Sequence, residues 1–498
     1  MTAHLKQEAM HYVLTNSADS LRRAGGMLTL LVVSLWLRKN HHSMLPFLPI
    51  FTLAQATPMP APAPTPPTEI VQPQTVRPLP GKLDDVPVFN SNSPEVVQTE
   101  GILLSTFPSN GKSTPTAHLN FAFKGRFDIF AHHIAKPPSP EDLRTLYLGF
   151  IVYNPGEKPV TVDILQAASY LSQPDAPFIE LPSLVDNTAG TVYAGPGSRA
   201  MKDILLGLRQ ANFPPVLVIP PKQSQMLLNL PIPVRTLEPP LNGRSTLMRL
   251  RSNDAVYVAS LARYAPVDAD GNERAPTLEE WQELLDKGDL AGPREAPATP
   301  PEVTTGPFFY GRVAGVAQGS QWQAQLTDSP TAQFLSIPDS GQAFSYGLST
   351  LPLGLLGTGQ SQSAQMLVRY PNTAYLAYGN YGIQYSLTLP LVNPTSKTQT
   401  VTLAIQTPLK EDKPQRGLRF LEPPAKQVFF RGTVQIRYKD DEGLPRTNYF
   451  HLVQRRGQQG EPLVMLKMPP GDRRLVQVDF LYPPDSTPPQ VLTVRTQD

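Results

Sequence analysis

The chain has 498 residues, of which 40% are hydrophobic and 17% charged, and its formal net charge is +2. This composition suffices for two or three folded domains, and the balanced charge argues against nucleic acid or an acidic membrane surface as partner. The chain contains no cysteine, which excludes disulfides, thiol catalysis and cysteine-ligated metals. Its 57 prolines are about twice the average share and predict many turns and edge strands.

Two short apolar runs occupy the N-terminus, at 25–37 and 44–54. Each is shorter than the roughly 18 to 20 residues that span a bilayer, and each matches the hydrophobic region of a signal peptide. The second run ends in the small-x-small motif AQA at 54–56. We therefore expect 1–56 to be a signal or targeting segment, which is either cleaved after this motif or kept as a membrane anchor. The true translation start can also lie within this segment. Such a segment predicts a periplasmic, secreted or cell-surface protein that meets the membrane only through its N-terminus.

The next stretch, 57–85, is rich in proline and alanine. Such sequence favours extended polyproline II and buries little, so we expect a disordered spacer. Two folded halves are then expected, at 86–266 and 303–498. Between them, 267–302 is expected to be a Pro-rich linker with one helix at 277–285.

One pattern occurs in both halves. The segment LYLGFIVYNPGEKPVTVDIL at 146–165 predicts an apolar strand, an Asn-Pro turn and an alternating strand, which together we interpret as a hairpin. The segment LTLPLVNPTSKTQTVTLAI at 387–405 repeats it with a constant offset (393 − 154 = 239). We infer an internally repeated all-β protein built from two related immunoglobulin-like β-sandwich halves.

The turn residues themselves are Asn154, Pro155, Asn393 and Pro394. Proline pushes the preceding residue into an extended conformation, from which an asparagine oxygen can accept the N–H two residues on as an Asx-turn. We therefore expect both asparagines to stabilise the turns, each through one hydrogen bond of about 1 kcal/mol.

A second repeated element follows each Asn-Pro turn. Pro220-Pro221 precedes a strand containing Met226, Leu228, Leu230 and Ile232, expected on one face. The double prolines recur with an offset of 249 (469 − 220), but the strand residues recur with 248 (476 − 228). We expect one residue to have been gained or lost in the turn between them.

The linker helix has a well-specified start. Thr277 and Glu280 have the spacing of a capping box, in which each side chain accepts a backbone N–H of the other residue. The apolar face of this helix is formed by Leu278, Trp281, Leu284 and Leu285.

Several groups are candidates for chemistry, and each has a structural reading beside the functional one. Asp128 lies near histidines that suit zinc or iron (His118, His132 and His133), although a hydrogen-bonded structural role is the more common one. The segment 268–272 resembles a calcium loop but has Glu273 where glycine is needed. The arginine pairs at 455–456 and 473–474 suit an anionic polysaccharide or a solvated surface. We assign no catalytic residue, no metal and no cofactor.

The densest aromatic cluster is the group Tyr375, Tyr378, Tyr381 and Tyr385. Exposed rings stack on sugar faces, whereas rings in strands more often belong to a core. These tyrosines are the candidate glycan-binding residues.

The segments FDIFAHHIA at 127–135, YGNYGIQYSLTLPLVNP at 378–394 and LVQVDFLYPP at 475–484 resemble a cyanobacterial family of exported proteins, described only as a domain of unknown function. The resemblance covers most of the chain after about residue 80. It implies an envelope or periplasmic location and transfers no catalytic residue.

Taken together, these features favour a non-enzymatic, exported cell-envelope protein with a binding or structural role. Envelope polysaccharide or another envelope protein is the candidate partner. One alternative is a carbohydrate-active enzyme or esterase, which convergent carboxylates or a Ser–His pair in a pocket would favour. The other is an assembly chaperone, which an exposed apolar edge strand would favour.

Overall fold

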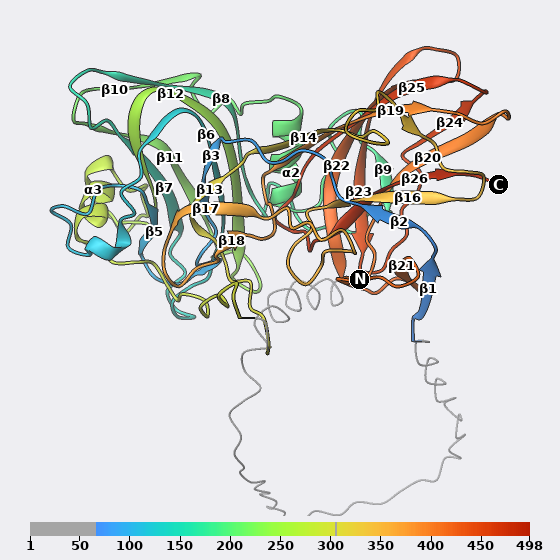
Figure 1. The fold of residues 1–498 in the computed structure, drawn as a ribbon. Coiled ribbons are helices and arrows are strands. Elements are labelled where there is room, and N and C mark those ends of the chain that lie inside the picture. Colours follow the sequence, from blue (N-terminus) through green and yellow to red (C-terminus); the bar gives the residue numbers. More distant parts are fainter. Residues whose placement is uncertain (1–65, 304–305) are drawn as a thin grey trace, which may run out of the picture. The chain divides into compact units, whose positions relative to one another are not determined.

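The computed structural model describes residues 66–303 and 306–498. The expected signal segment at 1–56 and the first part of the expected spacer lie outside the described residues. The prediction of an all-β, sandwich-like fold is confirmed, because nearly all of the regular secondary structure in the described residues is strand, and the helices are few and short (Figure 1). The described residues belong to one compact unit, and none of their helices is long and apolar enough to cross a bilayer.

The first sandwich is a single sheet folded into two layers by its longest strand, β12 (Asn242–Tyr264). The N-terminal part of β12 pairs with β6 (Phe123–Ala135) and β8 (Val160–Leu171), and its C-terminal part pairs with β5 (Gly101–Ser105) and β7 (Leu146–Tyr153). A register shift between Ser252 and Val256 marks the passage from one layer to the other. The remaining strands of this sheet are β3 (Pro87–Ser91), β4 (Val96–Val97), β10 (Val216–Ile219), β11 (Ser224–Ile232), β13 (Ala314–Gln318), β17 (Ala364–Arg369) and β18 (Leu376–Ala377).

The second sandwich consists of a seven-stranded and a five-stranded sheet. Apolar side chains of both sheets, such as Leu389 and Leu403, share one core. The seven-stranded sheet contains β9 (Leu184–Asp186), β14 (Gln321–Gln325), β15 (Leu335–Ser336), β19 (Gln384–Val392), β22 (Val428–Lys439), β23 (Pro445–Arg455) and β25 (Arg473–Leu481). The five-stranded sheet contains β2 (Thr75–Arg77), β16 (Ala343–Leu348), β20 (Gln399–Gln406), β24 (Val464–Met468) and β26 (Gln490–Thr496). A separate ribbon pairs β1 (Thr68–Gln72) with β21 (Leu418–Glu422).

The two Asn-Pro turns are corners between layers, and the expected hairpins are therefore wrong. β7 pairs with β11 and β12, whereas β8 pairs with β10 and the other part of β12. Likewise β19 belongs to the seven-stranded sheet and β20 to the five-stranded sheet. A strand, a turn and a strand have the same sequence pattern whether the strands pair with each other or face each other across a core.

At the first corner, Asn154 is fully buried. Its Oδ1 accepts the N–H of Gly156 at 2.8 Å, which is the predicted Asx-turn. Its Nδ2 also donates to the carbonyl oxygens of Lys158 at 2.7 Å and Ile219 at 3.0 Å. The side chain thus ties the β7–β8 corner to the end of β10.

The second corner repeats these contacts around Asn393, which is also fully buried. Its Oδ1 accepts the N–H of Thr395 at 2.9 Å, and its Nδ2 donates at 2.8 Å to the carbonyl oxygens of Lys397 and Met468. Both asparagine side chains therefore hold their corners together through several buried hydrogen bonds, whereas the sequence predicted only one bond each.

The one-residue change in offset comes from a bulge inside β11. The prediction that the residue was gained or lost in the turn before this strand is therefore wrong. Ser224 and Arg473 begin equivalent ladders with an offset of 249 (473 − 224). The register of β11 against β7 then shifts between Met226 and Leu228, while the β25–β19 ladder continues without a shift. The offset is therefore 248 from Val476 onward. The bulge also turns Met226 away from the core that Leu228 enters.

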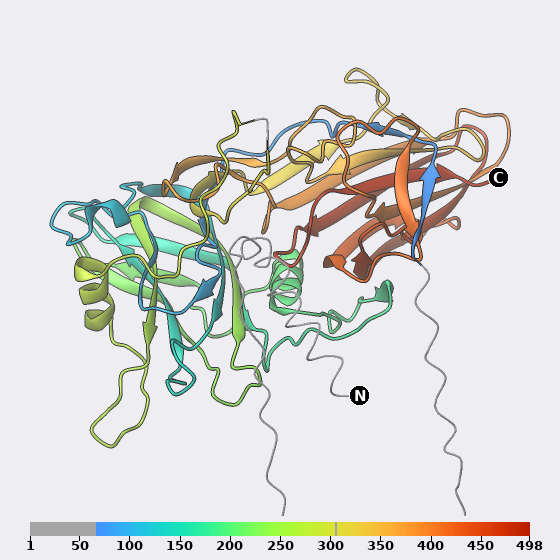
Figure 2. The ribbon, with the colours of Figure 1, turned by 90° about the horizontal axis from the view of Figure 1, so that it is seen from below.

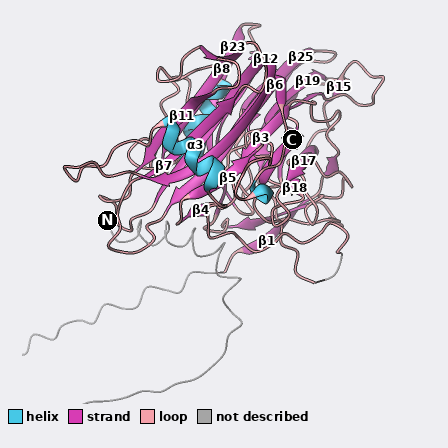
Figure 3. Ribbon diagram, turned by 90° about the vertical axis from the view of Figure 1, so that its left-hand side faces the viewer, coloured by secondary structure: helices cyan, strands magenta, loops and turns pink. Residues whose placement is uncertain are grey.

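The expected linker helix is confirmed as α3 (Leu278–Lys287), with the capping box between Thr277 and Glu280. Trp281 and Leu285 are buried against residues of β5, β7 and β12, so α3 packs on the outside of the first sandwich (Figure 3). The expected linker is thus part of the folded body.

A second helix, α2 (Pro196–Leu205), was not expected. It packs against β8 and β12 of the first sandwich and against β22 and β25 of the second. Ala200, Met201 and Ile204 enter the larger core. Pro196 at its start, Gly207 after its end and this apolar spacing are signals that could have revealed it.

The boundaries expected for the spacer and for the two folded halves do not coincide with the boundaries of the sheets. Within 66–85, β1 pairs with β21 and β2 with β16, so this part of the expected spacer is structured; Figure 2 shows β1 in blue beside β21 in orange. β-branched residues such as Ile70, Val71 and Val76 favour strand despite the neighbouring prolines. In addition, β13, β17 and β18 follow residue 303 yet join the first sheet, while β9 joins the second sandwich.

Candidate functional site

The four tyrosines expected to bind glycan do not form an exposed platform. Tyr385 is fully buried and stacks on Phe480, with ring centroids 5.2 Å apart. Tyr378 is buried, and Tyr375 and Tyr381 are half-buried. The prediction is corrected because Tyr378, Tyr381 and Tyr385 fill the core or pack against it. The ring of Tyr375 is covered by the guanidinium of Arg369, whose Cζ lies 3.7 Å from the ring centroid.

The candidate metal-binding histidines are buried, and burial lowers the pKa of each one. Their pKa falls to about 4 for His118 and to about 3 for His132 and His133. Asp128 forms an ion pair with Arg126. Within the described residues, no three His, Asp or Glu side chains are grouped as metal ligands.

Each of these imidazoles also contacts a serine hydroxyl, which bears on the hydrolase alternative. The pairs are His118–Ser105 at 2.9 Å, His132–Ser245 at 2.8 Å and His133–Ser91 at 2.9 Å. All three serines are 0% exposed, so a substrate cannot reach their hydroxyls. The pairs therefore satisfy buried polar groups and do not form an accessible nucleophile.

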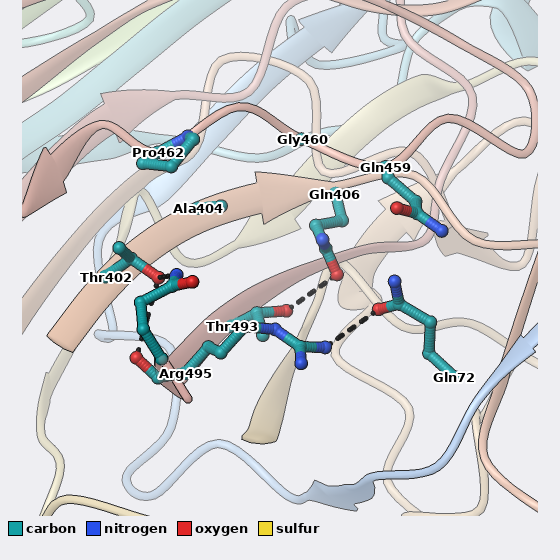
Figure 4. A pocket seen from close by; sticks show the side chains of 10 residues that line it. Gln72, Thr402, Ala404, Gln406, Gln459, Gly460, Pro462, Thr493 and Arg495 are labelled. Carbon is teal, nitrogen blue, oxygen red and sulfur yellow. Dashed lines mark hydrogen bonds between the residues drawn. The ribbon is translucent and has the colours of Figure 1, made fainter. Parts of the chain in front are cut away.

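An accessible polar pocket of about 190 Å³ lies on the outer face of the five-stranded sheet (Figure 4). Alternate residues of β20, such as Leu403, point into the core, so Thr402 and Gln406 point outward. β1 and the loop 459–462 form the sides of the pocket. The lining residues are Gln72, Thr402, Ala404, Gln406, Gln459, Gly460, Pro462, Thr493, Arg495 and Gln497.

Hydrogen bonds join six of the lining side chains in pairs. They run from Thr493 Oγ1 to Gln406 Oε1 at 3.0 Å, from Gln497 Nε2 to Thr402 Oγ1 at 3.3 Å and from Arg495 Nη2 to Gln72 Oε1 at 3.1 Å. Gln72 and Gln406 use their carbonyl oxygens in these bonds. Their amide nitrogens have no hydrogen-bond partner among the described residues and remain free to donate to a ligand.

Two glycines allow the sides of the pocket to approach the sheet. A Cβ on Gly460 would lie 1.9 Å from the carbonyl oxygen of Ile405 in β20. Gly417, immediately before β21, has a φ of 128°, and a Cβ added there would lie 2.0 Å from the carbonyl oxygen of Gln72. Only glycine fits at both positions without moving the loop or β1.

A family model described as "Protein of unknown function (DUF3370)" matches residues 74–496. The chain belongs to this family. The expectation of a domain of unknown function is thereby confirmed. No curated protein matches the chain. Among solved structures, the crystal structure of coconut allergen cocosin is 9% identical, with 76% of this chain and 84% of that chain covered. Its TM-score is 0.10, so the likeness carries no argument.

The DUF3370 match contains eight of the ten residues that line the pocket. Gln72 lies two residues before the match begins (74 − 72 = 2) and Gln497 one residue after it ends (497 − 496 = 1), whereas β20, β26 and the loop 459–462 lie inside it. The strand β1, which forms one side of the pocket, thus lies before the region that the family model matches.

A second pocket of this DUF3370 protein, of about 380 Å³, is lined by one stretch of chain between β8 and α2. Its walls are mainly aliphatic and proline side chains, with Thr191, Tyr193 and one carboxylate, Asp175. Asp175 already accepts the N–H of Leu171 at 2.8 Å. The first pocket has more free polar groups, so we take it as the candidate site.

The pocket residues were missed for an identifiable reason. Thr402 and Gln406 in β20, and Thr493 and Arg495 in β26, alternate with apolar residues, which is a visible signal of a polar sheet face. That pattern is common to any sheet with one solvated face. What makes this face a pocket is Gln72, which lies more than 400 residues away in the chain from Arg495 (495 − 72 = 423).

Proposed function

We propose that this DUF3370 protein is a non-catalytic binding protein of the cell envelope that holds a polar polysaccharide. The observation that carries the proposal is the lining of the first pocket, which offers four glutamine amides, two threonine hydroxyls and one guanidinium. Amides and hydroxyls both donate and accept, which suits a polyhydroxylated ligand. The volume is below the roughly 300 Å³ at which drug-sized pockets begin, so it suits one sugar unit of a longer chain.

This pocket has no lining side chain that could act as a general acid or a general base in hydrolysis, which supports a binding role. Its lining contains no carboxylate and no imidazole, so it has neither the carboxylate pair of a glycosidase nor a general base. The three Ser–His pairs of the described residues are buried away from solvent.

The proposed location rests on the N-terminal sequence and on the family resemblance. The run ending in AQA at 54–56 has the form of a signal peptide, and the segments quoted above resemble exported cyanobacterial proteins. A chain without cysteine is compatible with an oxidising compartment.

Calorimetric titration of the protein with neutral and acidic oligosaccharides tests the proposal. We expect at least one oligosaccharide to bind, and we expect Gln406→Ala to lower its affinity about 5- to 10-fold by removing a donor from the pocket floor. Thr493 keeps its bond to Ser345 in this variant, so the fold should be retained. Gln365→Ala, at an exposed position of β17, is the matched control and should bind as the parent does. No binding of any oligosaccharide contradicts the proposal.

A second candidate function is that of an assembly chaperone, which β10 favours. Among the strands that the structure describes, β10 ends the order of the first sheet and pairs only with β8. Val216 is 42% exposed and Val218 56%, so apolar side chains stand at an open strand edge. If an apolar peptide in extended form binds and no oligosaccharide does, this function replaces the first.

A further inference from the structure

We propose that the pocket selects an anionic sugar unit, bearing a carboxylate or a sulfate ester, and that Arg495 is the residue that recognises it. The inference rests on the proposed function and names the class of polysaccharide. Arg495 is the only charged residue among the ten that line the pocket. It is half-buried, and it forms no ion pair with any acid of the described residues.

The guanidinium is held in place by a neutral partner. Its Nη2 donates to Gln72 Oε1 at 3.1 Å, and Figure 4 shows the two side chains meeting across the pocket. A guanidinium has five N–H donors and no acceptor, so this bond occupies one donor and leaves the fork available. Because the partner carries no charge, the positive charge of Arg495 remains uncompensated at the pocket.

The other free groups of the pocket hold more N–H donors than acceptors. The amide nitrogens of Gln72, Gln406 and Gln459 have no partner among the described residues, and each carries two N–H donors. The free acceptors are the side-chain carbonyl oxygens of Gln459 and Gln497. A ligand group that only accepts, such as a carboxylate, satisfies these donors and the guanidinium together. Charge-assisted bonds of this kind are about twice as strong as neutral ones, and a guanidinium matches both carboxylate and sulfate-like geometry.

Gln72 is positioned by the pairing of β1 with β21. The register places Gln72 opposite Leu418, and Arg419 of β21 reaches Glu69 of β1 at 3.1 Å. Gly417 permits the close approach at this end of the ribbon. β1 thus places the neutral partner of Arg495, and we assign Gln72 as a positioning residue.

Titration with galactose oligomers of equal length in neutral, carboxylated and sulfated forms tests the proposal. We expect one or both anionic forms to bind at least about 10-fold more tightly than the neutral form, with an affinity that falls as salt is added. Arg495→Gln should lower the anionic affinity about 10- to 100-fold and change the neutral affinity by less than about threefold. Arg495→Lys, which keeps the charge and loses the fork, should fall between the two.

The controls separate this proposal from the one on which it rests. Arg251→Gln, at an exposed position of β12 in the first sandwich, should leave every affinity unchanged. Gln72→Ala should lower the anionic affinity more than the neutral affinity, since it removes one amide donor and also frees the guanidinium to move. If the neutral and anionic forms bind equally, and Arg495→Gln melts like the parent and changes neither affinity, the anionic selectivity is overturned. The proposal of polysaccharide binding is then retained. Binding of none of the three forms overturns both.

Discussion

Asn154→Ala is expected to destabilise the protein by about 3 to 5 kcal/mol, and Asn393→Ala by a similar amount. Each substitution removes an acceptor and two donors at a fully buried corner and leaves carbonyl and N–H groups there without partners. A typical hydrogen bond contributes about 1 kcal/mol, but each buried group left unsatisfied costs about 1 to 3 kcal/mol. Urea denaturation followed by circular dichroism measures the effect.

Two further variants show whether the corner works as described. Asn154→Asp keeps the acceptor for Gly156 but directs a carboxylate oxygen at the carbonyls of Lys158 and Ile219, so it should be at least as harmful as alanine. Asn110→Ala, in an exposed turn, should change the stability by less than about 0.5 kcal/mol. If Asn154→Ala is as stable as Asn110→Ala, the buried hydrogen bonds of Asn154 do not hold the corner together.

The second large effect concerns Asp485, in the loop after β25. This carboxyl is 3% exposed, and its Oδ2 has no hydrogen-bond partner among the described residues. It faces the start of α2, where a Cβ on Gly197 would lie 3.0 Å from Oδ2. Burial raises the pKa of Asp485 to about 7, although Arg431 lowers it and Glu95 adds to the rise.

Asp485→Asn is expected to stabilise the protein increasingly as the pH rises. The folded protein holds the Asp485 proton up to about pH 7, whereas the unfolded chain releases it near 3.8, the ordinary pKa of an aspartate, so the parent loses stability as the pH rises between these values. One pKa unit corresponds to about 1.4 kcal/mol, so the advantage of the asparagine variant should grow by about 2 to 3 kcal/mol between about pH 5 and pH 8.

The difference between the two proteins isolates this carboxyl. The buried histidines also make stability depend on pH, but they titrate alike in the parent and the variant. Urea denaturation across this pH range measures the difference, and Asp339→Asn at an exposed position is the control. Parallel stability curves for Asp485→Asn and the parent would show that Asp485 does not hold its proton in the folded state.

Local chemistry was predicted well from the sequence, whereas strand partners were not. The Asx-turns at Asn154 and Asn393 and the capping box at Thr277 depend on neighbours within a few residues, and the structure confirms them. Whether β7 pairs with β8 or faces it across a core depends on distant strands, and here the prediction failed. For the same reason, β1 was expected to be a spacer because its partner, β21, lies about 350 residues further along the chain.

The site was the least predictable part. Aromatic density led to the tyrosines near β19, yet apolar rings are also what a core needs, and most of these rings are in the core or at its edge. The pocket instead depends on glutamines and one arginine that have no distinctive spacing. Its polar character is visible in β20 and β26, but its side depends on Gln72 in a strand that pairs from the far end of the chain.

Hydrogen exchange with and without a carboxylated galactose oligomer tests most directly whether the polar pocket is the binding site. β1 belongs to a two-stranded ribbon and should exchange quickly in the free protein, so its protection is a sensitive readout. At a ligand concentration that saturates the parent but lies below the dissociation constant of Arg495→Gln, exchange is expected to slow at 68–72 and 459–462 in the parent but not in the variant. Protection confined to 174–193, around the second pocket, or an unchanged pattern while the oligomer is bound, would contradict the assignment.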